Sequence, residues 1–338
     1  MSAEKRATTG SRQQNSVGLV LENFNEEAAR LLVSDLKENS EESALMKLLS
    51  AISATLRQSD LGNTRLIITG DLVASVNSRE DRTHKKFTTE RGAGVVAAKT
   101  MPPNSGGIVD ILVPSHWVLP LDKDQPSKER DEYIEHIAAH EAVHASIFHI
   151  NNKPFELYQR SHSGFAMQNF LSMAGKQIEE HLAEYLGSKT TGRKIGQTAD
   201  QVKASISAWR ETLDKELPAI PKSAPDYFQQ GMSVSLESLH ILWKSLAYLA
   251  AALRNDDKFD PVPQGITDLP EWQELIAPWW QKHLELLRRI PMTVDLDVKA
   301  TDKVVSEMGH FLQSWADSIG FDFHDTDNGP YFRIKIWD

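Results

Sequence analysis

The stretch from Glu129 to His149 constrains the fold most, because its residues favour a helix that packs against the rest of the protein. Its central part reads IEHIAAHEAVHASIFH, and no glycine or proline interrupts it. Apolar residues lie on several faces of such a helix instead of forming one narrow stripe. They are Ile134, Ile137, Ala138, Val143, Ile147 and Phe148. We therefore expect a buried helix here.

Three residues of this helix form the motif H-E-x-x-H, namely His140, Glu141 and His144. Residues four apart lie on the same helix face one turn apart, so both imidazoles can bind one metal ion. Glu141 is turned by about 100° from His140, where its carboxylate can reach a metal-bound water instead of the metal. The motif therefore predicts a metal site in which Glu141 is the general base.

A catalytic zinc ion needs a third protein ligand and an open position for water. A second predicted helix, Gly164–Leu186, contains IEEHLAEYL, in which Glu180 and Glu184 are four residues apart. One of these carboxylates can bind the metal while the other holds a ligand histidine in its proper tautomer. This E-x-x-A-E pattern favours Glu180 as the third ligand, and Glu179 stays open as the alternative.

Other ligand sets are less consistent with the sequence. His181 would complete a three-histidine site, but it lies too far along the chain from His144 for the motif H-E-x-x-H-x-x-G-x-x-H. The chain has no cysteine, so thiolate ligands are excluded. Two histidines and one carboxylate can also bind iron, cobalt or manganese. Iron sites of this kind usually belong to β-barrels, and the helical motif favours zinc.

The sequence HEAVH, followed by EHLAE on a second helix, resembles the gluzincin class of zinc metallopeptidases. The resemblance covers about residues 92–187. It implies one zinc ion per chain, with His140, His144 and Glu180 as its ligands. Glu141 would then be the general base in the hydrolysis of a protein or peptide substrate. Glu184 stands where that class usually has an aspartate, and its expected role is to orient a ligand histidine.

The N-terminal half is predicted to combine helices with a small sheet. Two helices, Asn25–Leu36 and Ser43–Leu56, precede three short β-branched runs at Thr64–Thr69, Val95–Lys99 and Ile108–Val113. The turn-rich sequence MPPNSGG joins the last two runs, which we expect to form an antiparallel hairpin. The zincin resemblance further implies that one of them is the edge strand above the H-E-x-x-H helix, where an extended peptide can add.

Helices dominate after Pro120, so that the chain as a whole is predicted to have an α+β fold. They are predicted at Glu129–His149, Gly164–Leu186, Thr198–Leu217, Met232–Leu253, Leu269–Arg289 and Val298–Ser318, followed by a strand at Tyr331–Ile336. A small zincin-type sheet with the H-E-x-x-H helix is expected to precede a mainly α-helical second half. The expected units are a disordered tail at 1–16, a zincin-like metallopeptidase domain at 17–195 and a helical C-terminal domain at 196–338.

Composition restricts the partners of the protein. The 338 residues include 37 Lys and Arg against 47 Asp and Glu, a net charge of −10, whereas a nucleic-acid-binding protein needs a basic face. The most apolar helical stretch, Ile241–Leu253, contains Lys244 and is too short to span a bilayer. Met1–Ser16 lacks the apolar segment of a secretion signal. We expect a cytoplasmic protein without nucleic-acid or membrane partners, and its oligomeric state stays open.

The residue that stabilises the transition state is not identified by any motif. A tyrosine or histidine near the metal can donate a hydrogen bond to the developing oxyanion. The candidates are Tyr158, His162, Tyr227, His240, Tyr248 and His310. Two other interpretations stay open: a zincin-like module that binds zinc or a partner without catalysis, and a helical protein that binds no metal. The tryptophans of the second half could serve an interaction, but we expect most of them in the core.

Overall fold

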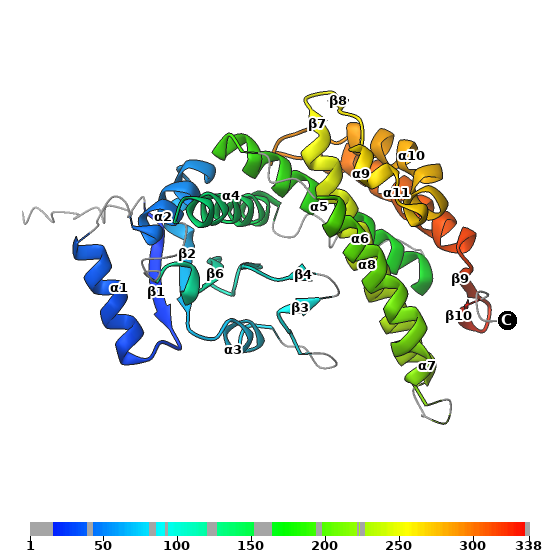
Figure 1. Cartoon of the computed structure of the whole chain (residues 1–338), viewed down its shortest axis with the longest axis horizontal. Helices are drawn as coiled ribbons and strands as arrows, with labels where there is room; N and C mark the ends of the chain where they lie inside the picture. The colour runs from blue at the N-terminus through cyan, green and yellow to red at the C-terminus, as the bar shows by residue number, and fades with distance from the viewer. Residues whose placement is uncertain are drawn as a thin grey trace, which may run out of the picture.

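A four-stranded mixed sheet lies at one end of the molecule, and long helices form most of the rest (Figure 1). The computed structural model describes residues 16–38, 43–80, 86–91, 94–119, 127–151, 164–193, 198–221, 223 and 227–334. Strands β1 (Gly18–Glu22), β2 (Thr64–Thr69) and β6 (Val109–Pro114) are parallel neighbours in that order. Strand β5 (Lys99–Met101) runs antiparallel to β6 and forms one edge of the sheet.

The middle of the sheet is covered on both faces. Leu66 and Ile68 of β2 belong to the apolar core formed with helices α2 (Ala44–Thr55) and α4 (Ser127–Asn151). Ile67 points to the opposite face, where it packs in a smaller core with α3 (Leu72–Asn77). Because successive strand residues point to opposite faces, a strand buried on both sides must be apolar at consecutive positions, as β2 is.

Helix α5 (Phe165–Thr191) connects the sheet end of the molecule with the helical end. It packs against α4 on one side and against α8 (Tyr227–Leu253) and α11 (Val298–Ser318) on others (Figure 1). Trp243 and Trp315 lie fully buried between these helices, with ring centroids 5.1 Å apart. Most tryptophans of the second half are core residues, as expected; the buried ones are Trp209, Trp243, Trp272, Trp280 and Trp315.

The remaining elements are short or lie around this framework. They are α1 (Glu26–Glu38), η1 (Leu61–Asn63), β3 (Glu90–Arg91), β4 (Gly94–Val95), η2 (Ser115–Trp117), α6 (Ala199–Glu211), η4 (Thr212–Glu216), α7 (Leu217–Ala219), β7 (Arg254–Asn255), β8 (Lys258–Phe259), α9 (Gln264–Thr267), η5 (Trp272–Ile276), α10 (Ala277–Arg288), β9 (Phe321–Thr326) and β10 (Gly329–Ile334). Within the described ranges, no helix is both long enough and apolar enough to cross a membrane.

The mixed helix-and-sheet architecture agrees with the predicted α+β class, and the antiparallel hairpin is confirmed. The position of its first strand was wrong, because Val95 pairs with Glu90 in a separate small ladder and β5 begins only at Lys99. Pro102 follows the end of β5 and has no backbone N–H to continue the ladder. Of the two strands of the hairpin, β5 therefore forms an edge of the sheet, and the run Ile108–Val113 lies inside the sheet as β6.

Two predicted helices are interrupted. Thr198–Leu217 and Leu269–Arg289 each contain a π-helical turn, at Thr212–Glu216 and Trp272–Ile276. Each turn is followed within two residues by a proline, Pro218 or Pro278, which cannot donate the regular helical hydrogen bond. Strands β1 and β9 and helix α3 were not predicted. Residues 1–15 of the expected tail, and the end of the expected strand Tyr331–Ile336 beyond Ile334, lie outside the described residues.

Candidate metal centre

Helices α4 and α5 form the candidate site by packing closely against each other. The helix α4 carries His140, Glu141 and His144, and α5 carries Glu180. Gly187 of α5 lies against the backbone of α4: a Cβ atom at this position would be 3.0 Å from the backbone nitrogen of His140 and 3.2 Å from its Cα. The two helices can therefore approach this closely at His140 only because position 187 has no side chain.

Three potential ligand atoms meet between these helices. The Nε2 atoms of His140 and His144 are 3.1 Å apart, and Oε2 of Glu180 lies 3.4 Å from the first and 3.6 Å from the second. All three residues are buried, at 7–9% exposure. Ligand atoms about 2.0–2.1 Å from a tetrahedral zinc ion lie about 3.3–3.4 Å from one another. The separations of these three atoms therefore fit one shared ion of that size.

Two more carboxylates orient the histidines. Nδ1 of His140 lies 3.2 Å from Oε2 of Glu184, and Nδ1 of His144 lies 2.9 Å from Oε1 of Glu179. With the ring protons on Nδ1, both Nε2 lone pairs face each other and the Glu180 carboxylate, an arrangement that a cation satisfies. Glu179, the alternative third ligand, thus contacts the opposite side of the His144 ring from the proposed ion. Glu184 contacts His140 as expected.

His136 extends this arrangement by one helical turn. Its Nε2 atom lies 2.9 Å from Oε1 of Glu184, so the Glu184 carboxylate is held by two histidines of α4 at once. The ring is 4% exposed. His136, His140 and His144 recur every four residues on one face of α4. That spacing was a signal in the sequence from which the position of His136 could have been predicted.

The charges around the cluster shift the pKa values of its members in a consistent way. Burial alone would lower the pKa of His140, but its hydrogen bonds to Glu180 and Glu184 outweigh burial and raise the pKa to about 10. Burial raises the pKa of Glu180, whereas the charge of Lys244 and the bonds to both histidines bring it well below its usual range. These buried carboxylates therefore require positive charge next to them, which protons or a metal ion can supply.

Glu141 lies beside this cluster and faces the sheet edge. Thr100 of β5 places its hydroxyl 2.6 Å from Oε2 of Glu141 and 2.9 Å from the Glu141 backbone oxygen. The Glu141 side chain is thus held by the edge strand, and within the described residues it makes no hydrogen bond to either histidine. The carboxylate of Glu141 is therefore not one of the three converging ligand atoms.

Of the six candidates for transition-state stabilisation, the structure places Tyr248 against the cluster. Its hydroxyl donates a 2.7 Å hydrogen bond to Oε2 of Glu180, and its ring centroid is 5.8 Å from that of His140. His310 and Tyr227 are exposed on α11 and α8, and His240 lies two turns before Tyr248. Tyr158 and His162 lie outside the described residues.

His181 does not join the cluster. Its Nδ1 faces the backbone oxygen of Ala247 at 3.3 Å, and its Nε2 lies 3.2 Å from Nη1 of Arg254. Burial, together with the charge of Arg254, lowers the pKa of His181 to about 3. The ring is therefore a neutral part of the core between α5 and α8.

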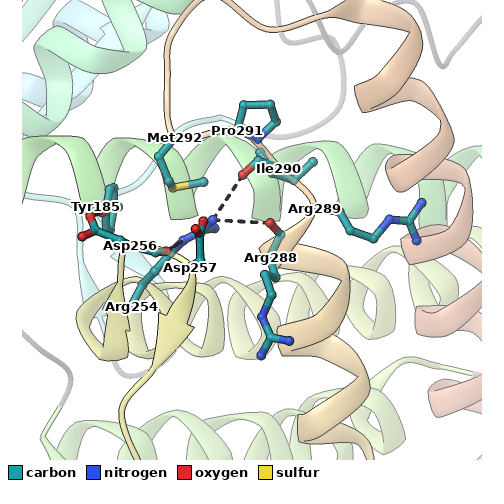
Figure 2. A pocket seen from close by; sticks show the side chains of 9 residues that line it. All are labelled: Tyr185, Arg254, Asp256, Asp257, Arg288, Arg289, Ile290, Pro291 and Met292. Atoms are coloured by element: carbon teal, nitrogen blue, oxygen red, sulfur yellow. Dashed lines mark hydrogen bonds between the residues drawn. The ribbon is translucent and has the colours of Figure 1, made fainter.

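A pocket of about 250 Å³ lies elsewhere and contains none of the cluster residues. Figure 2 shows Arg254 pointing to the backbone oxygens of Arg288 and Ile290 at the end of α10, at 3.5 and 3.3 Å. A third backbone oxygen, that of Leu287, accepts a hydrogen bond of 2.9 Å from Arg254. These hydrogen bonds connect the end of α8 with the end of α10. Arg254 therefore stabilises the packing of these two helices.

Comparison of the chain with protein-family models, with curated proteins and with solved structures finds no match.

Proposed function

We propose that this protein is a zinc-dependent peptidase that hydrolyses peptide bonds, with one ion bound by His140, His144 and Glu180. The observation that supports this most directly is the buried triangle of two Nε2 atoms and one carboxylate oxygen, with separations of 3.1, 3.4 and 3.6 Å. A second carboxylate, Glu141, lies beside the triangle without belonging to it. Three protein ligands and a free carboxylate are the parts that metal-assisted hydrolysis requires.

A bound zinc ion would supply a water molecule of lowered pKa and would polarise the carbonyl of the scissile bond. Glu141 then accepts the proton of the attacking water and later gives a proton to the leaving amine. Thr100 keeps the Glu141 carboxylate in place while it carries the proton. Glu179 and Glu184 hold the two ligand histidines in the tautomer that leaves Nε2 free. Tyr248 donates its hydroxyl to Oε2 of Glu180 and would have to exchange that hydrogen bond to donate to the developing oxyanion.

The decisive experiment compares metal content and hydrolysis in the same set of purified proteins. Elemental mass spectrometry should find about one zinc ion per chain in the wild type and in Glu141→Gln, and much less in His144→Ala and Glu180→Ala. A library of internally quenched peptides, with unfolded casein beside it, should be cleaved by the wild type and not by Glu141→Gln. His310→Ala, which removes an exposed histidine of α11, is the control and should keep both properties.

Each failure has a distinct meaning. If the wild type binds no zinc even after zinc is added, the proposed site does not exist. If zinc binds in the wild type and is lost in His144→Ala, but no peptide or unfolded protein is cleaved, the protein is a zinc-binding module without peptidase activity. If Glu141→Gln cleaves as fast as the wild type, Glu141 is not the general base.

A further inference from the structure

Two residues of helix α8 hold Glu180, the third residue of the candidate metal centre. Lys244 places Nζ 2.5 Å from Oε1 of Glu180, and Tyr248 donates its hydroxyl to Oε2 at 2.7 Å. Residues four apart lie on one face of a helix, so Lys244 and Tyr248 reach the same carboxylate from successive turns. Helix α8 packs against α5, which carries Glu180, and thereby brings both side chains to it.

The two oxygens of Glu180 have different partners. Oε2 lies 3.4 Å from Nε2 of His140 and 3.6 Å from Nε2 of His144, so it is the oxygen that completes the triangle of ligand atoms. A carboxylate oxygen has two lone pairs, so Oε2 can accept the hydrogen bond of Tyr248 and still bind a cation. Oε1 is bound by the ammonium group of Lys244. A metal ion at the triangle would therefore meet one oxygen of Glu180 and not both.

The position of the Lys244 ammonium group is defined by two contacts. Besides its contact with Oε1 of Glu180, Nζ lies over the ring of Tyr248, 5.5 Å from the ring centroid. The Glu180 side chain is 11% exposed, so its charge is largely removed from water and requires a close cation. The Lys244 side chain is 37% exposed and reaches Glu180 from the surface of the protein.

Glu179, the preceding residue of α5, divides its two oxygens in the same manner. Its Oε1 lies 2.9 Å from Nδ1 of His144, and its Oε2 accepts a hydrogen bond of 2.7 Å from Lys176. In both glutamates a lysine thus binds the oxygen that the histidines of α4 leave free. Of the two lysines, Lys244 is the one that binds a proposed metal ligand.

We propose that Lys244 is a positioning residue that restricts Glu180 to binding the metal ion through Oε2 alone. This inference rests on the zinc site of the proposed function and does not require peptide hydrolysis. With three ligand atoms from the protein, a four-coordinate ion keeps one position for water. If Glu180 bound through both oxygens, it would supply a fourth ligand atom and crowd that position. Lys244 therefore keeps a coordination position open.

The test uses Co²⁺ as the probe in the full-length protein, because two histidines and one carboxylate also bind this ion. Four-coordinate cobalt absorbs visible light more strongly than five-coordinate cobalt, and the wild type should show the strong absorption. Lys244→Met keeps an unbranched side chain but removes its charge, which frees Oε1 for the ion. The absorption per bound cobalt ion should then fall by about twofold or more, as a fifth ligand atom changes the geometry.

Three further variants assign this change to the ammonium group. Lys244→Arg keeps a cation that can bind Oε1 and should restore the wild-type absorption. Lys203→Met removes an exposed lysine of α6 and should absorb as the wild type does. Lys244→Ala adds no apolar surface and provides the same test if circular dichroism shows that Lys244→Met does not fold. Elemental mass spectrometry gives the cobalt content by which each spectrum is divided.

The outcomes separate this inference from the proposed function. A weaker absorption in Lys244→Met that Lys244→Arg restores supports the role of Lys244 even if hydrolysis is never found. Equal absorption in the wild type and Lys244→Met, five-coordinate cobalt already in the wild type, or loss of the ion from both Lys244 variants contradicts this role. Peptide cleavage by the wild type would still support the peptidase in those cases. A wild type that binds neither cobalt nor zinc contradicts both proposals.

Discussion

The hydroxyl of Thr100 lies 2.6 Å from a carboxylate oxygen of Glu141, and this contact joins the edge of the sheet to the H-E-x-x-H helix. Thr100 is 4% exposed, so the hydrogen bond forms away from bulk water. A hydrogen bond to a charged group is worth more than one between neutral groups, about 1.5–3 kcal/mol. Thr100 thus fixes the direction of a side chain that helix α4 alone would leave free to rotate.

Replacing Thr100 with valine, which has nearly the same shape, should therefore reduce the turnover of peptides by roughly tenfold or more. The zinc content should stay at one ion per chain, because Thr100 contacts none of the three ligand residues. Steady-state kinetics beside elemental analysis measures both quantities. Thr100→Ser keeps the hydroxyl and should recover most of the rate; wild-type turnover in Thr100→Val would show that the contact has no role in catalysis.

The carboxylates behind the histidines should control metal affinity. Glu184→Gln and Glu179→Gln each weaken a contact to Nδ1 of a ligand histidine, and loss of such a partner typically costs 10- to 100-fold in affinity. Competition with a fluorescent zinc chelator measures the dissociation constants. The exposed Glu285 of α10 provides the matched control, Glu285→Gln, which should bind zinc as the wild type does. Unchanged affinity in both test variants would contradict this assignment.

The contact between Gly187 and the backbone of His140 should be sensitive to a single methyl group. Gly187→Ala places a Cβ 3.0 Å from a backbone atom that cannot move independently, which should push α4 and α5 apart. We expect a loss of about 1–3 kcal/mol in the free energy of unfolding, together with weaker zinc binding. Chemical denaturation and zinc titration test the two effects.

Gly231 of α8 supplies the control for this substitution. A Cβ there would meet only a side-chain atom of Leu217, at 3.8 Å. Alanine is favoured over glycine inside a helix by up to about 1 kcal/mol, so Gly231→Ala should be neutral or stabilising. Equal effects of the two substitutions would mean that the close helix approach at Gly187 is unimportant.

His283 should make the protein less stable in acid. It lies fully buried among Trp243, Trp280 and Phe311, and neither ring nitrogen has a hydrogen-bond partner among the described residues. Burial, with a smaller effect of the neighbouring His181, lowers its pKa to about 3. Between about pH 6.5 and pH 3 the unfolded chain binds a proton that the folded protein does not, so stability falls as the pH falls through this window.

His283→Leu removes this proton-binding group and should flatten the acid side of the stability curve. Thermal unfolding followed by circular dichroism at pH 7.5 and pH 4.5 measures the change. The loss of stability between the two pH values should be smaller in the variant than in the wild type. His310→Gln, at an exposed position of α11, should behave as the wild type; the same acid loss in His283→Leu would exclude His283 as a cause.

Removal of zinc should lower the temperature of unfolding. An ion that binds only the folded protein stabilises it by about 2.7 kcal/mol when its concentration is a hundred times the dissociation constant. Scanning calorimetry before and after treatment with EDTA, followed by addition of zinc, should show a reversible shift. The same treatment should leave His144→Ala unchanged, and a chelator effect of equal size in that variant would point to another metal site.

Features that depend on residues close together in the chain could be predicted from the amino-acid sequence alone. Helix α4 was predicted at Glu129–His149 and extends over Ser127–Asn151, because its periodicity and lack of helix breakers are local properties. The relative positions of His140, Glu141 and His144 follow from the geometry of one helix for the same reason. The choice between Glu179 and Glu180 did not, because both lie on α5 and contact histidines, and only the packing of α5 against α4 decides which one faces the two Nε2 atoms.

Features that join distant segments depend on how the whole chain packs. Strand β1 was not predicted because its sequence GLVLE, only partly buried, becomes a strand through pairing with β2. Thr100 and Lys244 reach the candidate site from β5 and α8, and no spacing in the chain connects them with α4. Helical and strand periodicity report which face of an element is buried, but which faces meet depends on the packing of the whole chain.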